Sequence, residues 1–279
     1  KRSRPLARVI TVTSGKGGVG KSNTAINLAI QFRKMGKKVV ILDADFGLAN
    51  IEIMFGAVPK HNLSDLIYQG KNIKDIITWG PMEVGFISGG SGITGLSNLS
   101  KDYLTYIVHN LAELDTIADV IIVDTGAGIS DAVLEFLVAS GEILLVTTPE
   151  PTSITDSYSL LKALNGHPGL ERDNTQICMI ANRVSAANEG EVLFQKLDVV
   201  VSRYLKLPIT YLGAVPQDPL LAKAVMQQLP VSLQNPQARS AQAYEEIAAK
   251  LMKQDEGQNT QKRGVAAFFS HIIGKRNNG

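Results

Sequence analysis

The sequence is poor in cysteine and has no long hydrophobic run. Cys178 is the only cysteine among 279 residues, which excludes an internal disulfide and a cysteine-rich metal or cluster site within one chain. No apolar run approaches the roughly eighteen residues of a transmembrane helix. No secretory signal precedes the first apolar segment, residues 7–14. These absences predict a cytoplasmic protein that does not span a membrane.

Excess charge and histidine are also scarce. The net charge is only +2 at pH 7, which is too weak to argue on its own for a nucleic-acid partner, and we do not expect one. The four histidines are scattered without the spacing of metal ligands. Hydrophobic residues make up 44% and charged residues 19% of the chain, a composition that supports a sizeable globular core.

Apolar runs and helical stripes alternate along the chain. Short, β-branched runs predict buried strands at 7–14, 37–45, 118–128, 141–151, 175–183 and 209–218. Stripes of helical period predict helices at 22–35, 153–164, 189–205 and 237–252. This alternation predicts an α/β fold, with a doubly wound, mostly parallel sheet and helices on both faces.

The last part of the chain differs in composition. Residues 1–252 form the expected α/β domain, residues 253–263 are polar and predict a linker, and residues 264–276 contain an isolated apolar island.

A glycine-rich loop, SGKGGVGKSN at residues 14–23, lies between the first strand and the first helix. Gly15, Gly17 and Gly20 fit the dinucleotide fingerprint G-x-G-x-x-G. Gly15, Gly20, Lys21 and Ser22 fit the P-loop motif G-x-x-x-x-G-K-[ST]. In either case, backbone N–H groups at the start of the helix can hold phosphate.

Three features favour the P-loop over the dinucleotide motif and over a simple turn. Lys21 and Ser22 supply a cation for the β/γ-phosphates and a hydroxyl for Mg²⁺. Asp124 ends a downstream buried strand, where a Walker-B carboxylate holds Mg²⁺ through water. Asp43 could bind the ribose of a dinucleotide, but Asp45 would then have no role.

Residues 16–22 also match K-G-G-x-G-K-[ST], the deviant Walker A motif, and nearly the whole chain resembles the MinD/ParA family of P-loop ATPases. The resemblance implies an ATPase of modest turnover that dimerises with ATP. Lys16 would reach the phosphates in the partner subunit; the alternative is an ordinary solvated loop cation. The resemblance also implies that ATP or ADP binds the loop through Gly15, Gly17, Gly18, Val19, Gly20, Lys21, Ser22 and Asn23.

The resemblance also assigns the two switch segments. Residues 42–56 resemble switch I, in which Asp45 would orient the attacking water and Asp43 would support Mg²⁺ through its hydration shell, alongside Ser22 and Asp124. The segment DTGAG at 124–128 resembles switch II, which places Gly128 near the γ-phosphate.

The base pocket is implied by two further segments. The ANR segment at 181–183 resembles the adenine-binding strand end of the family, with Asn182 and Arg183, although an ordinary turn is the alternative. A carboxamide suits adenine because it both accepts and donates hydrogen bonds. Pro216 and Asp218, in the VPQD segment, match the loop that closes the pocket, mostly through backbone.

The C-terminal island has a one-sided apolar face. On a helical wheel this face contains Val265, Phe268, Phe269, Ile272 and Ile273, and basic residues flank both ends. This composition is typical of an amphipathic helix that binds anionic lipid at a membrane surface. The alternative is a helix packed on its own core, and both arrangements can occur in different states.

Two segments indicate a branch of the family. Residues 147–164 (TTPEPTSITDSYSLLKAL) and 88–92 (SGGSG) resemble the FlhG branch, which regulates flagellar number and placement, more than the MinD branch. That resemblance implies the FlhF GTPase and flagellar C-ring proteins as partners, and a peripheral location of the ATP-bound dimer on the inner face of the cell membrane. A MinD-like division-site regulator and a ParA-like DNA-segregation ATPase are the alternatives.

Overall fold

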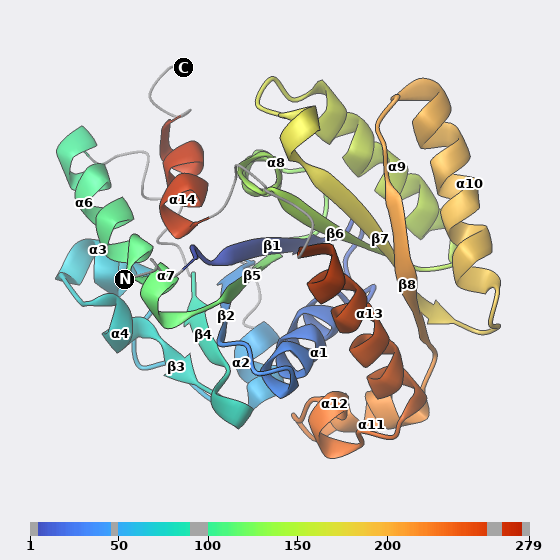
Figure 1. Cartoon of the computed structure of the whole chain (residues 1–279), viewed down its shortest axis with the longest axis horizontal. Coiled ribbons are helices and arrows are strands. Elements are labelled where there is room, and N and C mark those ends of the chain that lie inside the picture. Colours follow the sequence, from blue (N-terminus) through green and yellow to red (C-terminus); the bar gives the residue numbers. More distant parts are fainter. Residues whose placement is uncertain (1–4, 46–49, 90–99, 256–263, 275–279) are drawn as a thin grey trace.

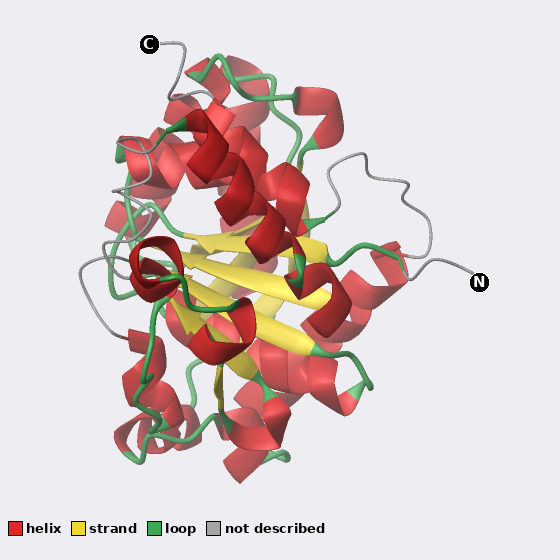
Figure 2. Cartoon of the chain, turned by 90° about the vertical axis from the view of Figure 1, so that its left-hand side faces the viewer, coloured by secondary structure: helices red, strands yellow, loops and turns green. Residues whose placement is uncertain are grey.

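The computed structural model describes residues 5–45, 50–89, 100–255 and 264–274. These residues form an eight-stranded sheet in the order β3-β4-β2-β5-β1-β6-β7-β8, with helices on both faces (Figures 1 and 2). Only β3 is antiparallel to its neighbour. The strands are β1 (Arg8–Thr13), β2 (Val39–Ala44), β3 (Thr78–Trp79), β4 (Gly85–Ser88), β5 (Val120–Thr125), β6 (Glu142–Thr147), β7 (Gln176–Val184) and β8 (Thr210–Pro216).

The helices divide between the two faces of the sheet. One face is covered by α1 (Lys21–Lys34), α2 (Asn50–Phe55), α11 (Pro219–Met226), α12 (Val231–Gln234) and α13 (Arg239–Asp255). The other is covered by α3 (Leu63–Gln69), α4 (Ile73–Ile76), α6 (Lys101–Ala112), α7 (Leu114–Ile117), α8 (Asp131–Ala139), α9 (Pro151–Gly166), α10 (Glu189–Tyr204) and α14 (Val265–Gly274). The predicted doubly wound α/β fold is confirmed.

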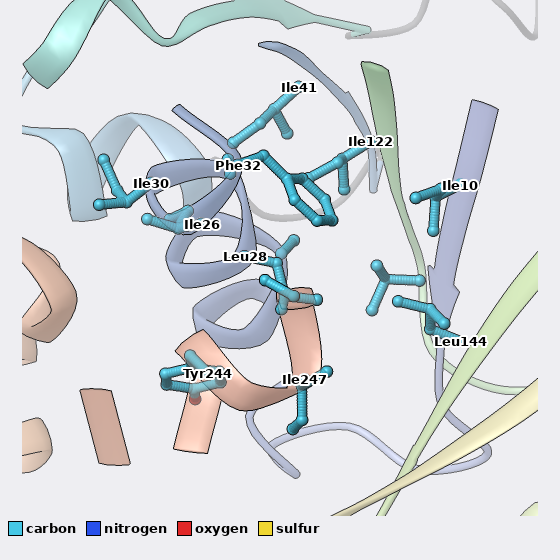
Figure 3. Packing of buried hydrophobic residues seen from close by; sticks show 14 of the residues in the cluster. Ile10, Ile26, Leu28, Ile30, Phe32, Ile41, Ile122, Leu144, Tyr244 and Ile247 are labelled. Atoms are coloured by element: carbon cyan, nitrogen blue, oxygen red, sulfur yellow. The ribbon is translucent and has the colours of Figure 1, made fainter. Parts of the chain in front are cut away.

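Continuous apolar strands are explained by burial on both faces. Along β1, Ile10 packs toward α1 and α13, whereas Val9 packs into the cluster on the opposite face. Figure 3 shows the first cluster, which contains Phe32 of α1, Ile247 of α13 and strand residues such as Ile10. Because consecutive strand side chains point to opposite faces, a central strand needs apolar residues at nearly every position.

The structure extends the predicted organisation in two places. At one edge of the sheet, β3 and β4 are strands of only two and four residues, too short to produce a recognisable pattern, and the sequence analysis did not predict them. At the other end of the chain, α13 continues to Asp255. Residues 253–255 are therefore helical rather than part of the linker, and residues 256–263 lie outside the described residues.

The C-terminal helix α14 is docked on the domain. Its apolar residues Val265, Phe268, Phe269, Ile272 and Ile273 are between 1% and 7% exposed. They pack with residues of α6 and α8 in the second cluster, and α14 lies beside α6 in Figure 1. This is the docked arrangement that the sequence left open, and membrane binding by the same face stays a prediction.

The start of α14 is fastened by a clasp centred on Asp115 of α7. The Asp115 carboxylate accepts hydrogen bonds from the backbone N–H of Val265, at 3.2 Å, and of Ala7, at 3.0 Å. Gly264 donates its N–H to the carbonyl of Ala7 at 3.0 Å and has φ of +97°. The backbone at Gly264 is left-handed, and a Cβ added there would lie 3.0 Å from Cδ1 of Leu6. This position therefore requires glycine.

Among the described residues, none of the helices combines the length and the apolar composition needed to cross a membrane.

Candidate functional site

The phosphate-binding loop joins the end of β1 to the start of α1. The N-cap of α1 is Gly20, which has φ of +94° and supplies no side-chain cap, so the helix start can offer its N–H groups to a ligand. The loop also approaches its neighbours closely. A Cβ on Gly15 would lie 2.3 Å from the backbone of Asp156, and one on Gly20 would lie 2.2 Å from Nδ2 of Asn182. Both positions therefore require glycine.

The structure brings Lys21, Ser22 and Asp124 together, as the motif spacing predicts. Lys21 Nζ lies 2.6 Å from Asp124 Oδ1, and the Ser22 hydroxyl donates to Asp124 Oδ2 at 2.7 Å. Asp124 is fully buried and Lys21 is 7% exposed. Burial raises the pKa of Asp124, whereas the neighbouring Lys21 cation lowers it, and the net shift is upward. This buried pair is a preformed charge arrangement beside the phosphate loop.

A second carboxylate lies next to this pair. Asp43 of β2 is the register partner of Asp124 on β5, and the backbone N–H of Asp45 donates to Asp43 Oδ1 at 3.1 Å. Burial and the nearby Asp124 raise the pKa of Asp43 to about 7. A divalent cation would offset this crowding of like charges.

Carboxylates and a hydroxyl are the hard oxygen donors that Mg²⁺ prefers, so Asp43, Asp124 and Ser22 fit the metal that the motif implies. The described residues contain no group of three or more His, Cys, Asp or Glu placed to hold a metal.

Lys16 lies at the surface of the loop and has a partner within its own chain. Its Nζ lies 2.9 Å from Glu150 Oε2 and 3.0 Å from the Thr152 hydroxyl, at the start of α9. The hydrogen bond from Lys16 lowers the pKa of Glu150. Exposed pairs of this kind contribute little to stability, so Lys16 can exchange Glu150 for another anion at small cost. Sequence reasoning missed Glu150; its position three residues after the end of β6, at the edge of the sheet where β1 also ends, was the available signal.

The switch II segment contacts the phosphate loop directly. Gly128, with φ of +91°, donates its N–H to the carbonyl of Ser14 at 2.9 Å. The N–H of Gly128, a residue expected near the γ-phosphate, is thus used within the protein in this structure. A small cavity of about 230 Å³ opens beneath the segment, and its walls include Asp45, Gly126 and Phe136. Residues 46–49 of the expected switch I lie outside the described residues.

A larger cavity of about 760 Å³ lies beside the loop and contains the residues expected around the base. Its walls include Gly20, Asn23, Asn182, Arg183, Pro216 and Asp218. Asn182 donates to the carbonyl of Val19 at 2.8 Å. Its Oδ1 is buried and has no hydrogen-bond partner among the described residues. An unpaired buried acceptor on a cavity wall fits a ligand that carries an amino group, as adenine does.

The side chain of Asp218, a residue expected in the loop that closes the pocket mostly through backbone, is bonded within the protein. Its carboxylate accepts hydrogen bonds from the Leu220 N–H at 3.0 Å and from the Ser240 hydroxyl at 2.7 Å. Asp218 therefore joins α11 to α13 and shapes the cavity. Sequence reasoning missed Arg239, which lines the same cavity from α13, because no motif marks it.

A phosphate loop, a buried Lys–Asp pair and a base-sized cavity at the carboxyl edge of a parallel sheet define a P-loop nucleoside triphosphatase. The ParA family model, described as "NUBPL iron-transfer P-loop NTPase", matches residues 6–252. The chain belongs to the ParA/MinD family of P-loop NTPases, whose members are ATPases.

Two flagellar proteins and a MinD homologue are among the relatives of the chain. The chain is 38% identical over 244 residues to "Antiactivator FleN" of Pseudomonas aeruginosa, covering 88% of this chain and 86% of that protein. It is 33% identical over 270 residues to "Flagellum site-determining protein YlxH" of Helicobacter pylori, covering 95% and 90%. A chloroplast minD homologue of Arabidopsis thaliana is 28% identical over 278 residues, covering 94% and 82%.

Solved structures show the same fold. The MinC:MinD complex of Aquifex aeolicus aligns with a TM-score of 0.69 at 23% identity, covering 88% of this chain and 96% of that one. MinD of Pyrococcus horikoshii complexed with Mg-ADP aligns with a TM-score of 0.69 at 22% identity, covering 90% and 98%.

The iron-transfer description belongs to the family model. In this chain Cys178 is the only cysteine. It lies buried in β7, and burial raises the pKa of its thiol to about 12. A cysteine pair for an iron cluster is therefore lacking within the chain.

Proposed function

We propose that the chain is an ATP-dependent dimerising ATPase that binds the inner face of the cell membrane and regulates flagellar number or placement. The observation that carries this proposal is the similarity to FleN and YlxH over 88% and 95% of the chain. Sequence identity to the MinD homologues is lower, at 27–29%. The FlhF GTPase and flagellar C-ring proteins are the proposed partners.

The proposed reaction is hydrolysis of ATP at the phosphate loop, with Mg²⁺ neutralising charge on the phosphate oxygens. Lys21 would bind the β/γ-phosphates in its own subunit, and Ser22, Asp43 and Asp124 would hold the metal. Asp45 would orient the attacking water. Lys16 would leave Glu150 and reach the nucleotide of the partner subunit, which makes hydrolysis depend on dimerisation.

Lys16→Ala should separate binding from dimerisation. In the single chain the Lys16 ammonium bonds to groups at the start of α9, so ATP affinity should stay within about twofold while the ATP-dependent dimer and its turnover fall by at least about tenfold. Light scattering and phosphate release measure these effects, with exposed Lys196 of α10 changed to Ala as the control. A normal dimer with normal turnover would reduce Lys16 to a loop cation.

Asp45→Ala should have the opposite consequence. Removing the water-orienting carboxylate blocks hydrolysis without removing a phosphate ligand, so the ATP-bound dimer should accumulate and turnover should fall by about 10²-fold or more. Size-exclusion chromatography with ATP, together with phosphate release, checks both effects. A variant that stays monomeric with ATP, or that hydrolyses it at the normal rate, would remove this role from Asp45.

We further propose that α14 leaves its docked position in the ATP-bound dimer and inserts its apolar face into anionic lipid. A single short amphipathic helix binds lipid weakly, whereas two helices on one dimer gain about 10²–10⁴ in affinity through avidity. Dimerisation would thereby control membrane attachment.

Sedimentation with anionic liposomes and a DNA shift assay, each with ATP and with ADP, test this proposal. ATP-dependent sedimentation without a DNA shift is the expected result. A DNA shift without sedimentation would favour a ParA-like segregation ATPase. Capture of MinC, but of neither FlhF nor C-ring proteins, would favour a MinD-like division-site regulator.

A further inference from the structure

The nucleotide site and the docked helix α14 are separated by one short helix, α8. This helix has nine residues, so its length is about 13 Å at 1.5 Å per residue. Its N-cap, Ser130, accepts a hydrogen bond from the Val133 N–H at 3.4 Å. Ser130 follows Gly128 by two residues, and Gly128 is bonded to Ser14 of the phosphate loop. The start of α8 is therefore tied to the phosphate loop through three residues of chain.

The far part of α8 contacts α14 through an aromatic pair. Phe136 is 2% exposed, and its ring centroid lies 6.0 Å from that of Phe268, with the rings tilted by 34°. Phe268 in turn packs edge-on against Phe269, at 5.2 Å and 89°. The aromatic side chain through which α8 contacts α14 is thus a large, rigid ring, and it packs against Phe268, one of the two phenylalanines of α14.

The same Phe136 reaches toward the nucleotide side. It lines the cavity of about 230 Å³ together with Asp45 of the switch I segment and Gly126 of switch II. Protein interiors are close-packed, so a displacement in one element moves its neighbours unless free volume absorbs it. The cavity on the phosphate side of α8 gives this helix room to shift. On the other side, the packed rings of Phe136 and Phe268 form a contact that such a shift would break.

An adjacent face of α8 packs on α9. Val133 and Leu137 of α8 belong to the same buried cluster as Leu160 and Leu161 of α9. The residue before α9 is Glu150, the partner of Lys16. Two elements that touch the phosphate site, switch II and α9, therefore meet at α8, and α8 contacts α14 directly.

We infer that α8 couples nucleotide state to the docking of α14, with the Phe136 ring as its contact residue. The inference rests on the proposed function, because it specifies how ATP would release α14. Rearrangement of switch II around the γ-phosphate shifts α8, the Phe136–Phe268 contact weakens, and α14 undocks. Phe136 is a positioning residue and touches no nucleotide in this assignment.

Hydrogen exchange of the full chain tests the coupling. The measured quantity is the ratio of α14 protection with ADP to protection with a non-hydrolysable ATP analogue. The wild-type ratio should be at least about tenfold, within the usual range of allosteric coupling. Phe136→Ala should lower protection in both states and bring the ratio to within about twofold of one.

The control loosens the same docking without touching α8. Asp115→Ala removes the clasp on Val265 and Ala7, so α14 should lose protection equally with ADP and with the analogue, and the ratio should stay at the wild-type value. Because Phe136→Ala leaves a cavity, Phe136→Leu is measured in parallel, and a fall of its ratio by at least about threefold is expected.

The outcomes distinguish the release of α14 from the role of α8 in that release. Wild-type protection that does not differ between nucleotides would overturn the proposed release of α14 itself, and the coupling with it. A nucleotide-dependent ratio in the wild type that is kept by both Phe136 variants would leave that release intact and overturn the role of α8. A ratio that falls in Asp115→Ala as far as in Phe136→Ala would also overturn it, because loosened docking alone would then account for the loss.

Discussion

Changing Phe268 and Phe269 together to glutamate should expel α14 from the domain in every nucleotide state and abolish liposome binding. Both rings are nearly fully buried, at 3% and 2% exposed, and burying two unpaired carboxylates costs several kcal/mol. The lost burial removes a further contribution of about 1.5–3 kcal/mol for each ring. The same two charges would then face anionic lipid and repel it. The variant helix should therefore bind neither the domain nor the membrane.

The measurements are hydrogen exchange of α14 and sedimentation with anionic liposomes, beside calorimetry with ATP. ATP binding should be retained, with an affinity at or above the wild-type value, because the phosphate loop lies away from the rings and a permanently undocked α14 no longer opposes ATP binding. Ser270→Glu is the matched control, since Ser270 is exposed on the same helix; it should leave docking intact. Unchanged liposome binding in the double variant would show that another surface meets the membrane. Loss of nucleotide binding with loss of thermal stability would make α14 a permanent core helix.

The apolar face of α14 suits both the domain and a membrane, and for this reason the position of α14 could not be predicted from the sequence. An apolar stripe flanked by basic residues satisfies both a protein groove and a lipid surface, because burial of apolar area is not directional. Residues that hold the docked helix, such as Asp115 and Phe136, are far away in the sequence and carry no motif. The structure was needed to show that they meet Val265 and Phe268.

The phosphate site was predictable for the opposite reason. Lys21 and Ser22 are specified by a local motif, and Asp124 follows a continuous apolar strand, whose end necessarily reaches the same edge of a parallel sheet. Glu150 and Arg239 were missed because only the strand and helix arrangement, and not residue spacing, brings them to Lys16 and to the base cavity. Residues in local motifs could therefore be predicted from the sequence, whereas contacts between distant segments could not.

Lys21→Ala should abolish measurable nucleotide binding. Lys21 is the cation of the phosphate loop, and a charge-assisted contact to phosphate contributes about 3 kcal/mol, which corresponds to a loss of about 10²-fold or more in ATP affinity. The change also leaves Asp124 buried without its 2.6 Å partner, so the nucleotide-free variant should melt at a lower temperature. Calorimetric titration with ATP and a thermal melt measure the two effects.

The loss of stability must be separated from the loss of the phosphate contact. The double variant Lys21→Ala with Asp124→Asn removes the unpaired buried charge, so it should recover much of the melting temperature without recovering ATP affinity. Lys196→Ala, at an exposed site on α10, controls for the loss of one positive charge and should bind ATP normally. If Lys21→Ala binds ATP with wild-type affinity, the loop is not a P-loop in function, and the roles assigned to Ser22 and Asp124 fail with it.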